Sequence, residues 1–342
     1  MEKITPVFQN YDWGSKTKLQ NLFSEAPKNK KIAEAWFGTH KRGDNISKIY
    51  GKDLPYLFKV LAVEKCLSLQ IHPNKKTAKL GFASENRRSV PLESAERVFK
   101  DPNSKPEMAV ALTDFLVVVG VKSEHSKKRF EEILKNKDSK KSKYTSKEYL
   151  EKKTREIQKR VKNGTSDSLS DKAFLFARSD YPDDPTALLL LEMNVEMLKP
   201  GQSVYLPDGI LHAYIRGECL EIMENSDNVF RAGLTNKYIN PKLVLDNGLF
   251  KPLPSYKPNT VAKSKNWTDY IPRGAGFGIM VGNGNFADEY LCQYHSGPKV
   301  LIALDGKFAV NDKNVKKGDA YFIDSKEQIL INGSGKFAIA HI

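Results

Sequence analysis

The sequence predicts a mainly β protein built from two jelly rolls, with a helical segment inserted into the first of them. Three observations lead to this fold class. Short runs of β-branched and aromatic residues alternate with Gly, Pro, Asn and Asp along most of the chain. A short pattern recurs late in the sequence, and a strongly basic stretch near the middle has the periodicity of helices.

Eight apolar runs in the first two-thirds of the chain are strand candidates. They are YLFKVLAV (56–63), CLSLQIHP (66–73), EMAVALTDFLVVVGV (107–121), ALLLLEMNVEML (187–198), SVYLP (203–207), LHAYIR (211–216), CLEIME (219–224) and NVFRAG (228–233). The runs FLVVVGV and ALLLL are far shorter than the about 20 residues of a membrane span, so we interpret them as buried strands. A smaller helical piece is expected within residues 77–99.

The basic stretch predicts two amphipathic helices. Residues 122–162 contain 16 Lys or Arg and 7 Asp or Glu, which is +9 of the net charge of +14. Apolar residues recur there at helical spacing, as Phe130, Ile133 and Leu134 and then as Tyr149, Leu150, Ile157 and Val161. Thr145 and Glu148 form a capping box for the second helix, and a loop is expected at 163–174. We interpret the charge as a solvated face; nucleic-acid binding is the alternative, and neither aromatic interleaving nor a known reader motif supports it.

The repeat divides the remaining chain. KPGQSVYLPDGILHAY (199–214) and KKGDAYFIDSKEQILI (316–331) share Lys-x-Gly, a short β run and an apolar strand, and His212 then falls opposite Ile329. The second copy keeps the strand pattern of the first but lacks its histidine. We therefore expect a discontinuous catalytic domain (1–121 with 186–244), a helical insert (122–185) and a degenerate β domain (245–342).

Composition limits the class of protein and its compartment. A content of 40% hydrophobic and 28% charged residues is typical of a globular protein, and the N-terminal sequence has no signal-peptide pattern. The three cysteines, Cys66, Cys219 and Cys292, form no C-x-x-C pair and predict a reducing compartment. We expect a cytoplasmic protein with no membrane or nucleic-acid partner.

Four side chains are candidate metal ligands. Gln70 and His72 lie two residues apart on a predicted strand, so they share a face, and Glu107 begins another strand after Pro106. His212 follows the Pro207-Asp208-Gly209 turn. Two imidazoles, a carboxylate and an amide oxygen suit Zn²⁺, with Fe²⁺ and Mn²⁺ as alternatives. The absence of a thiolate favours a catalytic site over a structural one.

The turn that carries His212 resembles the second cupin motif, with Gly201, Pro207, Gly209 and His212 in register. Arg216 replaces the closing Asn of that motif, and Gln70-x-His72 replaces the His-x-His of the first. These departures are those of the type I phosphomannose isomerases, which the chain resembles from end to end. The matching segments are QNYDWGS (9–15), AEAWFGTH (33–40), LPYLFKVLAVEKCLSLQIHPNK (54–75), DPNSKPEMAVAL (101–112), LPDGILHAYI (206–215) and ENSDNVFRAGLTNK (224–237).

The resemblance implies an activity and a ligand set. Gln70, His72, Glu107 and His212 are similar to the zinc ligands of that family, and Arg231 is similar to its catalytic arginine. The family interconverts mannose 6-phosphate and fructose 6-phosphate, which feeds mannose into GDP-mannose and glycan synthesis. We expect one Zn²⁺ per chain and a monomer, with a weak homodimer as the alternative.

Isomerisation needs a residue that transfers a proton between neighbouring carbons, and a positive group beside the enediolate oxygen. Arg231 suits the second role, because it stays charged at working pH. Glu221 is the first choice for proton transfer, followed by Asp227, Lys237 and His40, although Glu221 could instead orient His212. Lys59, Ser68 and Lys105 are candidate phosphate ligands. Tyr214, Asp227 and His40 are further expected substrate contacts.

Two other functions remain open from the sequence. Without Gln70, the set His72, Glu107 and His212 is the two-His-one-carboxylate set of non-haem iron oxygenases. A cupin that binds a sugar without converting it is the other alternative. The metal that copurifies and the consumption of O₂ distinguish the two enzymes, and the appearance of an isomer distinguishes either from a binding module.

Overall fold

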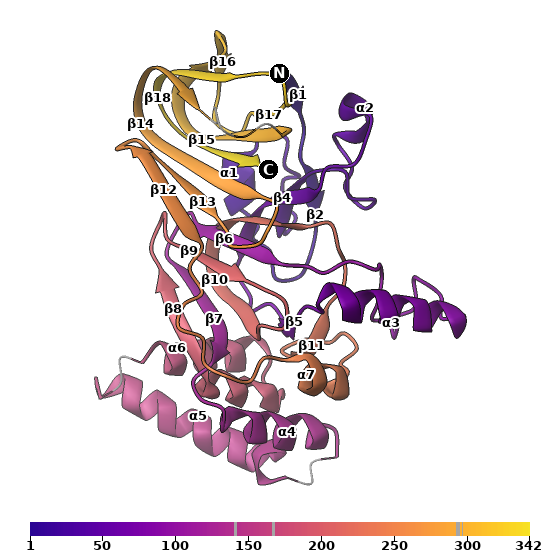
Figure 1. Cartoon of the computed structure of the whole chain (residues 1–342). Coiled ribbons are helices and arrows are strands. Elements are labelled where there is room, and N and C mark those ends of the chain that lie inside the picture. The colour runs from indigo at the N-terminus through magenta and orange to yellow at the C-terminus, as the bar shows by residue number, and fades with distance from the viewer. Residues whose placement is uncertain (140–141, 166–167, 292–294, 296) are drawn as a thin grey trace.

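The protein is strand-rich, with two β-sheets and helices packed around the first (Figure 1). The computed structural model describes residues 1–139, 142–165, 168–291, 295 and 297–342. The ten strands of the first sheet are β2 Val7–Gln9, β3 Glu34–Phe37, β4 Tyr56–Val63, β5 Leu69–Ile71, β6 Glu107–Ala111, β7 Phe115–Val121, β8 Met193–Leu198, β9 Ser203–Leu206, β10 His212–Glu224 and β11 Phe230–Gly233. The eight of the second are β1 Glu2–Ile4, β12 Asn259–Ser264, β13 Trp267–Ile271, β14 Gly278–Leu291, β15 Lys299–Val310, β16 Lys313–Val315, β17 Ala320–Ile323 and β18 Ile329–His341.

The longer helices lie beside or beneath the first sheet in Figure 1. The helices within the described residues are α1 Lys18–Leu22, α2 Ser47–Tyr50, α3 Lys75–Arg87, α4 Ser126–Asn136, α5 Lys147–Lys162, α6 Leu169–Asp180 and α7 Pro241–Asn247, with 3₁₀ turns η1 Lys143–Thr145 and η2 Pro185–Glu192. No helix in this part of the chain combines the length and the apolar character that a membrane crossing needs.

Strand β10 organises the first sheet, because it pairs with four other strands. Its first half pairs with β5 and β7, and its second half pairs with β4 and β6. The change of partners occurs at Gly217, whose φ of +118° lies in the region that glycine adopts without strain. A Cβ at Gly217 would lie 2.4 Å from the carbonyl oxygen of Asp114. The two halves of β10 therefore bring residues of both parts of the sheet to one cavity.

The internal repeat has the same structure in both copies. β9 (Ser203–Leu206) corresponds to β17 (Ala320–Ile323), and each is followed by a strand of 13 residues, β10 or β18. Gly201 and Gly318 of the two Lys-x-Gly patterns both have positive φ, +83° and +86°. His212 and Ile329 each begin their long strand, as the sequence alignment of the two copies predicts.

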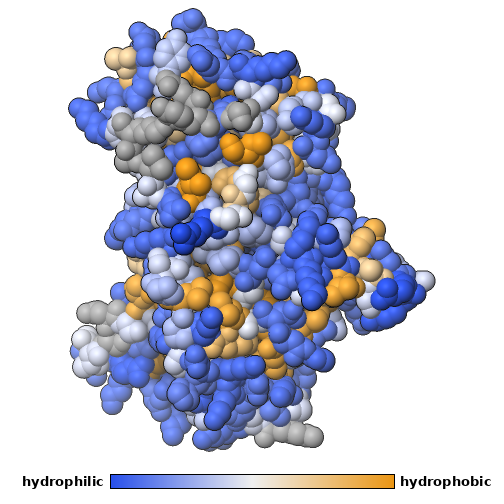
Figure 2. All heavy atoms as spheres, viewed as in Figure 1, coloured by the Kyte–Doolittle hydropathy of each residue, from blue (hydrophilic) through white to orange (hydrophobic). Residues whose placement is uncertain are grey.

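The two helices of the basic stretch form as predicted, and their apolar faces join the core beneath the first sheet. That core includes Phe130, Ile133, Leu134, Leu150 and Ile157 together with residues of β7 and β10. The predicted cap of α5 is one residue off: Ser146, not Thr145, is the N-cap, and its hydroxyl accepts from the amide of Tyr149. The outer surface of α4 and α5 is mostly hydrophilic (Figure 2).

Two local expectations are wrong, and a third is right in kind but not in its bounds. The ALLLL run lies in the 3₁₀ helix η2 rather than in a strand, because Asp184 caps that helix and a continuous apolar run fits either buried form. Helix α6 (Leu169–Asp180) begins inside the loop expected at 163–174, of which residues 166–167 lie outside the described part. The helical piece expected within 77–99 ends as α3 at Arg87.

Candidate metal centre

A tight turn places His212 at the start of β10. Gly209 in this turn has a φ of +79°, and a Cβ there would lie 2.9 Å from the carbonyl oxygen of Asn247. The amide of Gly209 donates to the carbonyl of His72 over 2.9 Å. His212 also pairs with Gln70 across β10 and β5. The turn therefore joins the two segments that carry the histidines.

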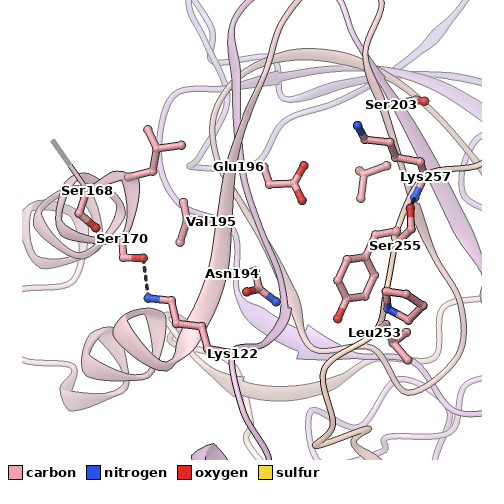
Figure 3. Close-up of a pocket in the computed structure, with 14 residues that line it drawn as sticks. Lys122, Ser168, Ser170, Asn194, Val195, Glu196, Ser203, Leu253, Ser255 and Lys257 are labelled. Carbon is pink, nitrogen blue, oxygen red and sulfur yellow. Dashed lines mark hydrogen bonds between the residues drawn. The ribbon is translucent and has the colours of Figure 1, made fainter.

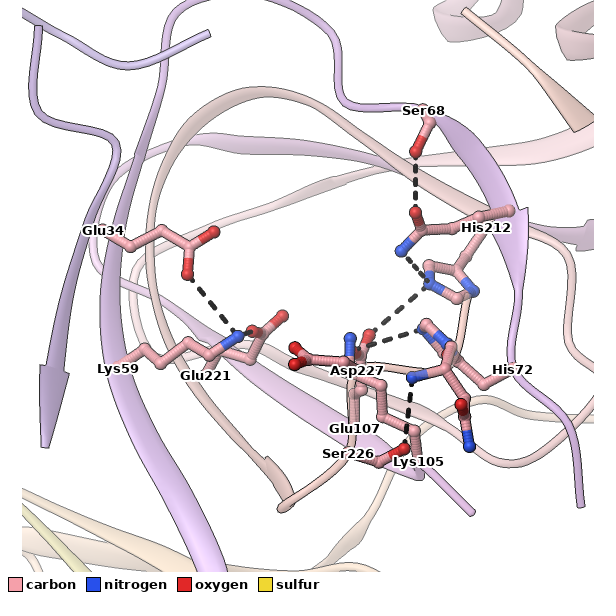
Figure 4. Close-up of polar contacts among 12 residues, drawn as sticks. Glu34, Lys59, Ser68, His72, Lys105, Glu107, His212, Glu221, Ser226 and Asp227 are labelled. Atoms are coloured by element: carbon pink, nitrogen blue, oxygen red, sulfur yellow. Dashed lines mark hydrogen bonds and ion pairs between the residues drawn. The ribbon is translucent and has the colours of Figure 1, made fainter. Parts of the chain in front are cut away.

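Three candidate ligands converge (Figure 4). His72 Nε2 lies 3.3 Å from Glu107 Oε1, and His212 Nε2 lies 3.5 Å from Glu107 Oε2. The three residues are each 2% exposed. Donor atoms that bind one Zn²⁺ at about 2.0–2.2 Å in a tetrahedron lie somewhat more than 3 Å apart, and the observed separations are of that size.

Backbone carbonyls fix the tautomers of both imidazoles. His72 Nδ1 donates to the carbonyl of Asn228 over 2.7 Å, and His212 Nδ1 donates to that of Ile210 over 2.8 Å. Each Nε2 therefore turns a lone pair toward Glu107. Burial lowers the pKa of His72 to about 4, so the ring is neutral at pH 7. His72 Nε2 is buried without a hydrogen-bond partner among the described residues. An unpartnered nitrogen in this position fits a divalent cation.

Gln70 joins the same site through its side-chain amide. Its Oε1 accepts from the hydroxyl of Ser68 over 2.7 Å, and its Nε2 lies 3.4 Å from His212 Nε2. The oxygen and nitrogen of an amide exchange places when the group rotates by half a turn. That rotation would present Oε1 beside His212 Nε2, which is the arrangement that metal binding requires.

Lys105 balances the charge of Glu107. Its Nζ lies 2.8 Å from Glu107 Oε1, and both side chains are buried. Burial disfavours the ionised carboxylate, but Lys105 and the two imidazoles outweigh it and hold the pKa of Glu107 well below its usual value. Glu107 is therefore anionic and available as a ligand at neutral pH.

A second buried charged group lies on β3, β4 and β10. Lys59 Nζ is 2.9 Å from Glu221 Oε2 and 3.5 Å from Glu34 Oε2. Glu34 also accepts from the indole nitrogen of Trp36. Burial raises the pKa of Glu221, although Lys59 opposes the shift. Burial works against the charge of Lys59, but Glu221 and Glu34 outweigh it and raise the pKa of the lysine.

The cations of the opposite wall have fewer partners. Arg231 on β11 pairs with Gln70 in the sheet, is half-buried and has no ion-pair partner among the described residues. Burial lowers the pKa of its guanidinium. Lys237 is exposed and lies over the ring of Tyr11, and burial and then Arg231 lower its pKa. These two cations are available for an anion.

Asp227 forms its own cluster with His40 and Arg42. His40 Nε2 is 3.3 Å from Asp227 Oδ2, and Arg42 Nη2 is 2.5 Å from Oδ1. Burial opposes ionisation of Asp227, but His40 and Arg42 outweigh it and hold the pKa of the carboxyl well below its usual value. Asp227 is therefore a structural anion at the rim and a poor proton acceptor.

These residues border one cavity of about 1010 Å³, large enough for a sugar phosphate. Of the sequence-predicted residues, the ones that line it are Lys59, Ser68, Gln70, Lys105, Glu107, His212, Tyr214, Glu221, Asp227, Arg231 and Lys237. His40 and His72 lie behind this lining. The EAWFGTH segment, expected to line one wall, does so through Glu34 and Trp36, whereas no role was predicted for Glu34 itself, for Arg42 just after it, or for Asn228, which orients His72.

Another hollow, of about 720 Å³, lies between β8 and the segment 253–257 (Figure 3). Lys122 Nζ donates to the hydroxyl of Ser170 at its edge over 2.9 Å. Its lining includes Asn194, Glu196 and Ser255 but, among the described residues, no histidine or cysteine. The ligand set of His72, Glu107 and His212 therefore belongs to the first cavity and has no counterpart in this hollow.

Comparisons with known proteins agree on one family. Residues 1–49 and 41–124 match the family described as phosphomannose isomerase type I, catalytic domain. The chain is 30% identical to the mannose-6-phosphate isomerase of Salmonella typhimurium, over 100% of this chain and 99% of the relative. It is 27% identical to the enzyme of Rattus norvegicus, over 96% and 94% of the two chains.

Solved structures give the same result. The crystal structure of apo mannose 6-phosphate isomerase from Salmonella typhimurium superposes with a TM-score of 0.81 at 28% identity, covering 100% of this chain and 98% of that one. A zinc-bound holo structure of mannose 6-phosphate isomerase superposes with a TM-score of 0.79 at 27% identity, covering 99% and 98%.

Proposed function

Because the chain belongs to the type I phosphomannose isomerase family, we propose that it interconverts mannose 6-phosphate and fructose 6-phosphate with the help of Zn²⁺. The observation that carries this function is the convergence of His72, Glu107 and His212 at the wall of the large cavity. The full-length similarity to relatives named for the same reaction supports it.

His72, Glu107 and His212 would hold the ion, and Gln70 would be the fourth ligand after its amide rotates. A bound Zn²⁺ would act as a Lewis acid that stabilises negative charge on a sugar oxygen. The donor set contains no thiolate, as expected for a catalytic zinc with an open position. We infer one such ion per chain.

Arg231 is the residue we assign to the developing enediolate. Its guanidinium lines the cavity, stays protonated at pH 7 and has no competing carboxylate partner among the described residues. Charge that develops on the sugar oxygens would be stabilised by this preorganised cation. Lys237 lies on the same wall and would add positive charge at the mouth of the cavity.

Glu221 is our choice for the proton transfer. In the forward direction the base takes the proton from C2 to give the C1–C2 enediolate, a proton passes from the C2 hydroxyl to the C1 oxygen, and the base returns its proton to C1. Burial raises the pKa of Glu221, which suits a group that must accept and return a proton. Asp227 is held ionised by its cationic partners, and His40 does not line the cavity.

Lys59 is better explained as the partner that holds Glu221 than as a phosphate ligand. Its ammonium already faces two carboxylates, so no positive charge is left there to balance a phosphate dianion. Ser68, Lys105, Tyr214 and Asp227 stay predicted substrate contacts. Lys105 would act on the substrate only while it also neutralises Glu107.

We infer that each sheet is a jelly roll of the cupin type, since the strand pattern β9–β10 recurs as β17–β18. The proposed domains are 1–121 with 186–244, the helical insert 122–185, and 245–342, to which β1 adds a strand. The buried, unpaired thiols of Cys66 and Cys219 support a cytoplasmic location. A monomer stays our prediction.

One experiment tests the reaction. A coupled assay would follow fructose 6-phosphate formed from mannose 6-phosphate, before and after chelation and after Zn²⁺ is restored. We expect activity to disappear with the chelator and to return with zinc. An oxygen electrode in the same samples tests the iron oxygenase, and O₂ consumption without isomer would contradict the proposal. Binding of the sugar phosphate without turnover would contradict it in favour of a binding module.

The same assay tests Glu221. The Glu221→Gln variant removes the charge while keeping the size of the side chain, so kcat should fall by about 10²-fold or more while zinc stays bound. Glu224→Gln on the same strand is the matched control, since Glu224 does not line the cavity. A variant Glu221→Gln with normal kcat would transfer the role to another residue.

A further inference from the structure

Three metal-binding side chains meet in the second sheet, away from the large cavity. Asp269 lies on β13, His295 lies between β14 and β15, and His341 ends β18. His295 Nε2 is 2.8 Å from Asp269 Oδ2, and His341 Nε2 is 2.7 Å from Asp269 Oδ1. The two imidazole rings are stacked, with centroids 3.6 Å apart and planes at 24°. Segments distant in the sequence thus bring two nitrogens to the two oxygens of one carboxylate.

The surrounding strands leave room for this group. Gly278 lies opposite His341 in the register of β14 and β18, and a Cβ there would lie 2.4 Å from His341 Cε1. Asp269 is 3% exposed and His341 is 2% exposed, whereas His295 is half-buried. A carboxylate and an imidazole are thus buried near one end of β13 and β18, with His295 on the side open to solvent.

Both imidazoles now donate a proton to the carboxylate of Asp269, and an ion would take the place of these protons. His341 Nδ1 is buried and has no hydrogen-bond partner among the described residues. His341 Nε2 donates its proton to Asp269 Oδ1, so binding of an ion at Nε2 would require that proton to move to Nδ1.

We propose that Asp269, His295 and His341 bind a second divalent transition-metal ion, with Zn²⁺ as the ion that this donor set suits. Two imidazole nitrogens and one carboxylate, with solvent in the remaining position, are a common set for Zn²⁺ and its neighbours. Ligands at about 2.0–2.2 Å from one ion require nitrogen-to-oxygen separations of about 3 Å or slightly more. The imidazoles would therefore move away from Asp269 by a few tenths of an ångström when the ion replaces the shared protons.

The position of this group gives the ion a structural role. Residues next to it connect the two sheets: the hydroxyl of Tyr56 on β4 donates to the carbonyls of Pro298 and Ala340, at 3.1 and 3.2 Å. Tyr270, adjacent to Asp269, donates to the carbonyl of Gly201. An ion here would tie the segment that carries His295 to β13 and β18, at the boundary between the sheets.

This site is independent of the first one. In the internal repeat the counterpart of His212 is Ile329, at the start of β18, whereas His341 lies at its other end. The second sheet therefore lacks the repeated histidine and would bind metal with different residues. The proposal does not depend on which reaction the first site catalyses.

The test is the metal content of the whole chain. Protein stripped with a chelator, reloaded with Zn²⁺ and desalted should contain two zinc ions per chain by elemental mass spectrometry. His295→Asn and Asp269→Asn should each contain one, and His212→Ala should also contain one. His125→Asn is the matched control: this exposed histidine lies outside both sites and should leave two ions bound. Reloading with Co²⁺ should give visible absorption bands that persist in His212→Ala and disappear when His295→Asn is added.

If the Asp269→Asn variant does not fold, because Asp269 is buried, His295→Asn decides the result. His295 is only half-buried, and circular dichroism would verify that the His295→Asn variant is folded. One zinc per chain in the wild type, unchanged in His295→Asn, would overturn the proposal and leave a hydrogen-bonded His-Asp-His group. Loss of an ion in His125→Asn as well would overturn it by showing nonspecific binding. His295→Asn should keep its isomerase activity, so failure of the proposed reaction would be seen separately, as a wild type that does not isomerise.

Discussion

The surroundings of two buried glutamates in the cavity shift their pKa values in opposite directions. Glu107 faces Lys105 and two imidazoles, which keep its pKa well below the usual value. Burial raises the pKa of Glu221, which shares Lys59 with a second carboxylate, Glu34. Sites that pair a permanently ionised carboxylate with one whose pKa is raised can separate binding from proton transfer. This contrast is the residue-level basis for assigning Glu107 to the ion and Glu221 to the proton.

Substitution of Arg231 and His212 should separate catalysis from metal binding. Arg231→Ala should retain zinc and lose about 10²–10³-fold in kcat, the usual cost of removing one group that stabilises an oxyanion. His212→Ala should lose zinc and activity together, because it removes a ligand. Elemental analysis and the coupled assay on the same samples measure both effects. Equal zinc loss in the two variants would refute this division of roles.

Asp208 should make stability depend on pH. Burial raises the pKa of its carboxyl to about 6, and Oδ1 has no hydrogen-bond partner among the described residues. Above pH 6 the folded protein therefore holds an unfavourable charge, whereas below pH 4 the carboxyl is protonated in both states. Asp208→Asn should stabilise the protein by about 1–3 kcal/mol at pH 7.5, the upper figure being the full shift in pKa.

Urea unfolding at pH 7.5 and at pH 4 measures this effect. The advantage of Asp208→Asn should shrink as the pH falls through the window from 6 to 4. Asp246→Asn, at an exposed ion pair with Lys242, is the control and should show no gain. An advantage of Asp208→Asn that persists unchanged at pH 4 would show that it does not come from ionisation.

At the scale of elements, the basic insert has two faces with different roles. The buried face of α5 joins the core of the first sheet through Leu150 and Ile157. The opposite face carries the exposed cations Lys152, Lys159 and Lys162. The insert is therefore attached through its apolar face, and deleting it would expose that core. Replacing only its charged face is the sharper test of whether the charge has a function.

The variant with Lys152→Gln, Lys159→Gln and Lys162→Gln should keep normal kcat/KM and a Tm close to that of the wild type, since exposed charges contribute little. Ile157→Ala on the same helix should cost about 2–5 kcal/mol, because it leaves a cavity in the core. The coupled assay and thermal unfolding measure both. A several-fold loss of kcat/KM in the triple variant would show that the helix takes part in substrate capture.

Much of the element pattern was predictable from sequence, because strands with apolar residues between turns are local features. YLFKVLAV is β4 from its first residue to its last, and the repeat gives the positions of β9 and β17. The ALLLL run was mispredicted because a fully buried run has no alternation to distinguish strand from helix. The caps were uncertain by one residue, as Ser146 shows, since both Thr145 and Ser146 can accept the hydrogen bond.

The site was predictable only where spacing and turn chemistry determine it. The Pro-x-Gly turn before His212 and the Gln70-x-His72 pair are such features. The pairing of Arg42 with Asp227 and the bond from His72 to the carbonyl of Asn228 join residues far apart in the sequence. The meeting of Asp269, His295 and His341 depends on sheet register in the same way. No local pattern in one sequence contains such information.

At the scale of the whole molecule, the two sheets are joined by buried polar contacts as well as by a shared core. Residues of both sheets, including Phe58, Ile222, Val300 and Ala338, pack into one hydrophobic cluster. The fully buried Tyr56 extends its hydroxyl across the boundary to two carbonyls. The sheets should therefore unfold together rather than as separate units.

Tyr56→Phe should lower the free energy of unfolding by about 1–2 kcal/mol, because both carbonyls lose a buried donor. A single transition in urea should remain in the wild type and in the variant. Tyr238→Phe, which changes an exposed side chain, is the control and should leave stability unchanged. Two separate transitions in the wild type would show that the boundary is weaker than these contacts imply.

The pairing of β1 with β17 has a consequence for how the protein is made. Lys3 lies opposite Tyr321, so the strand with the lowest residue numbers pairs with one of the last. During translation β1 has no partner until the ribosome has polymerised more than three hundred further residues. Pairings between such distant segments form slowly, and a waiting strand with free backbone groups is prone to aggregate. Assembly of the second sheet should therefore come late in synthesis and be sensitive to chaperones.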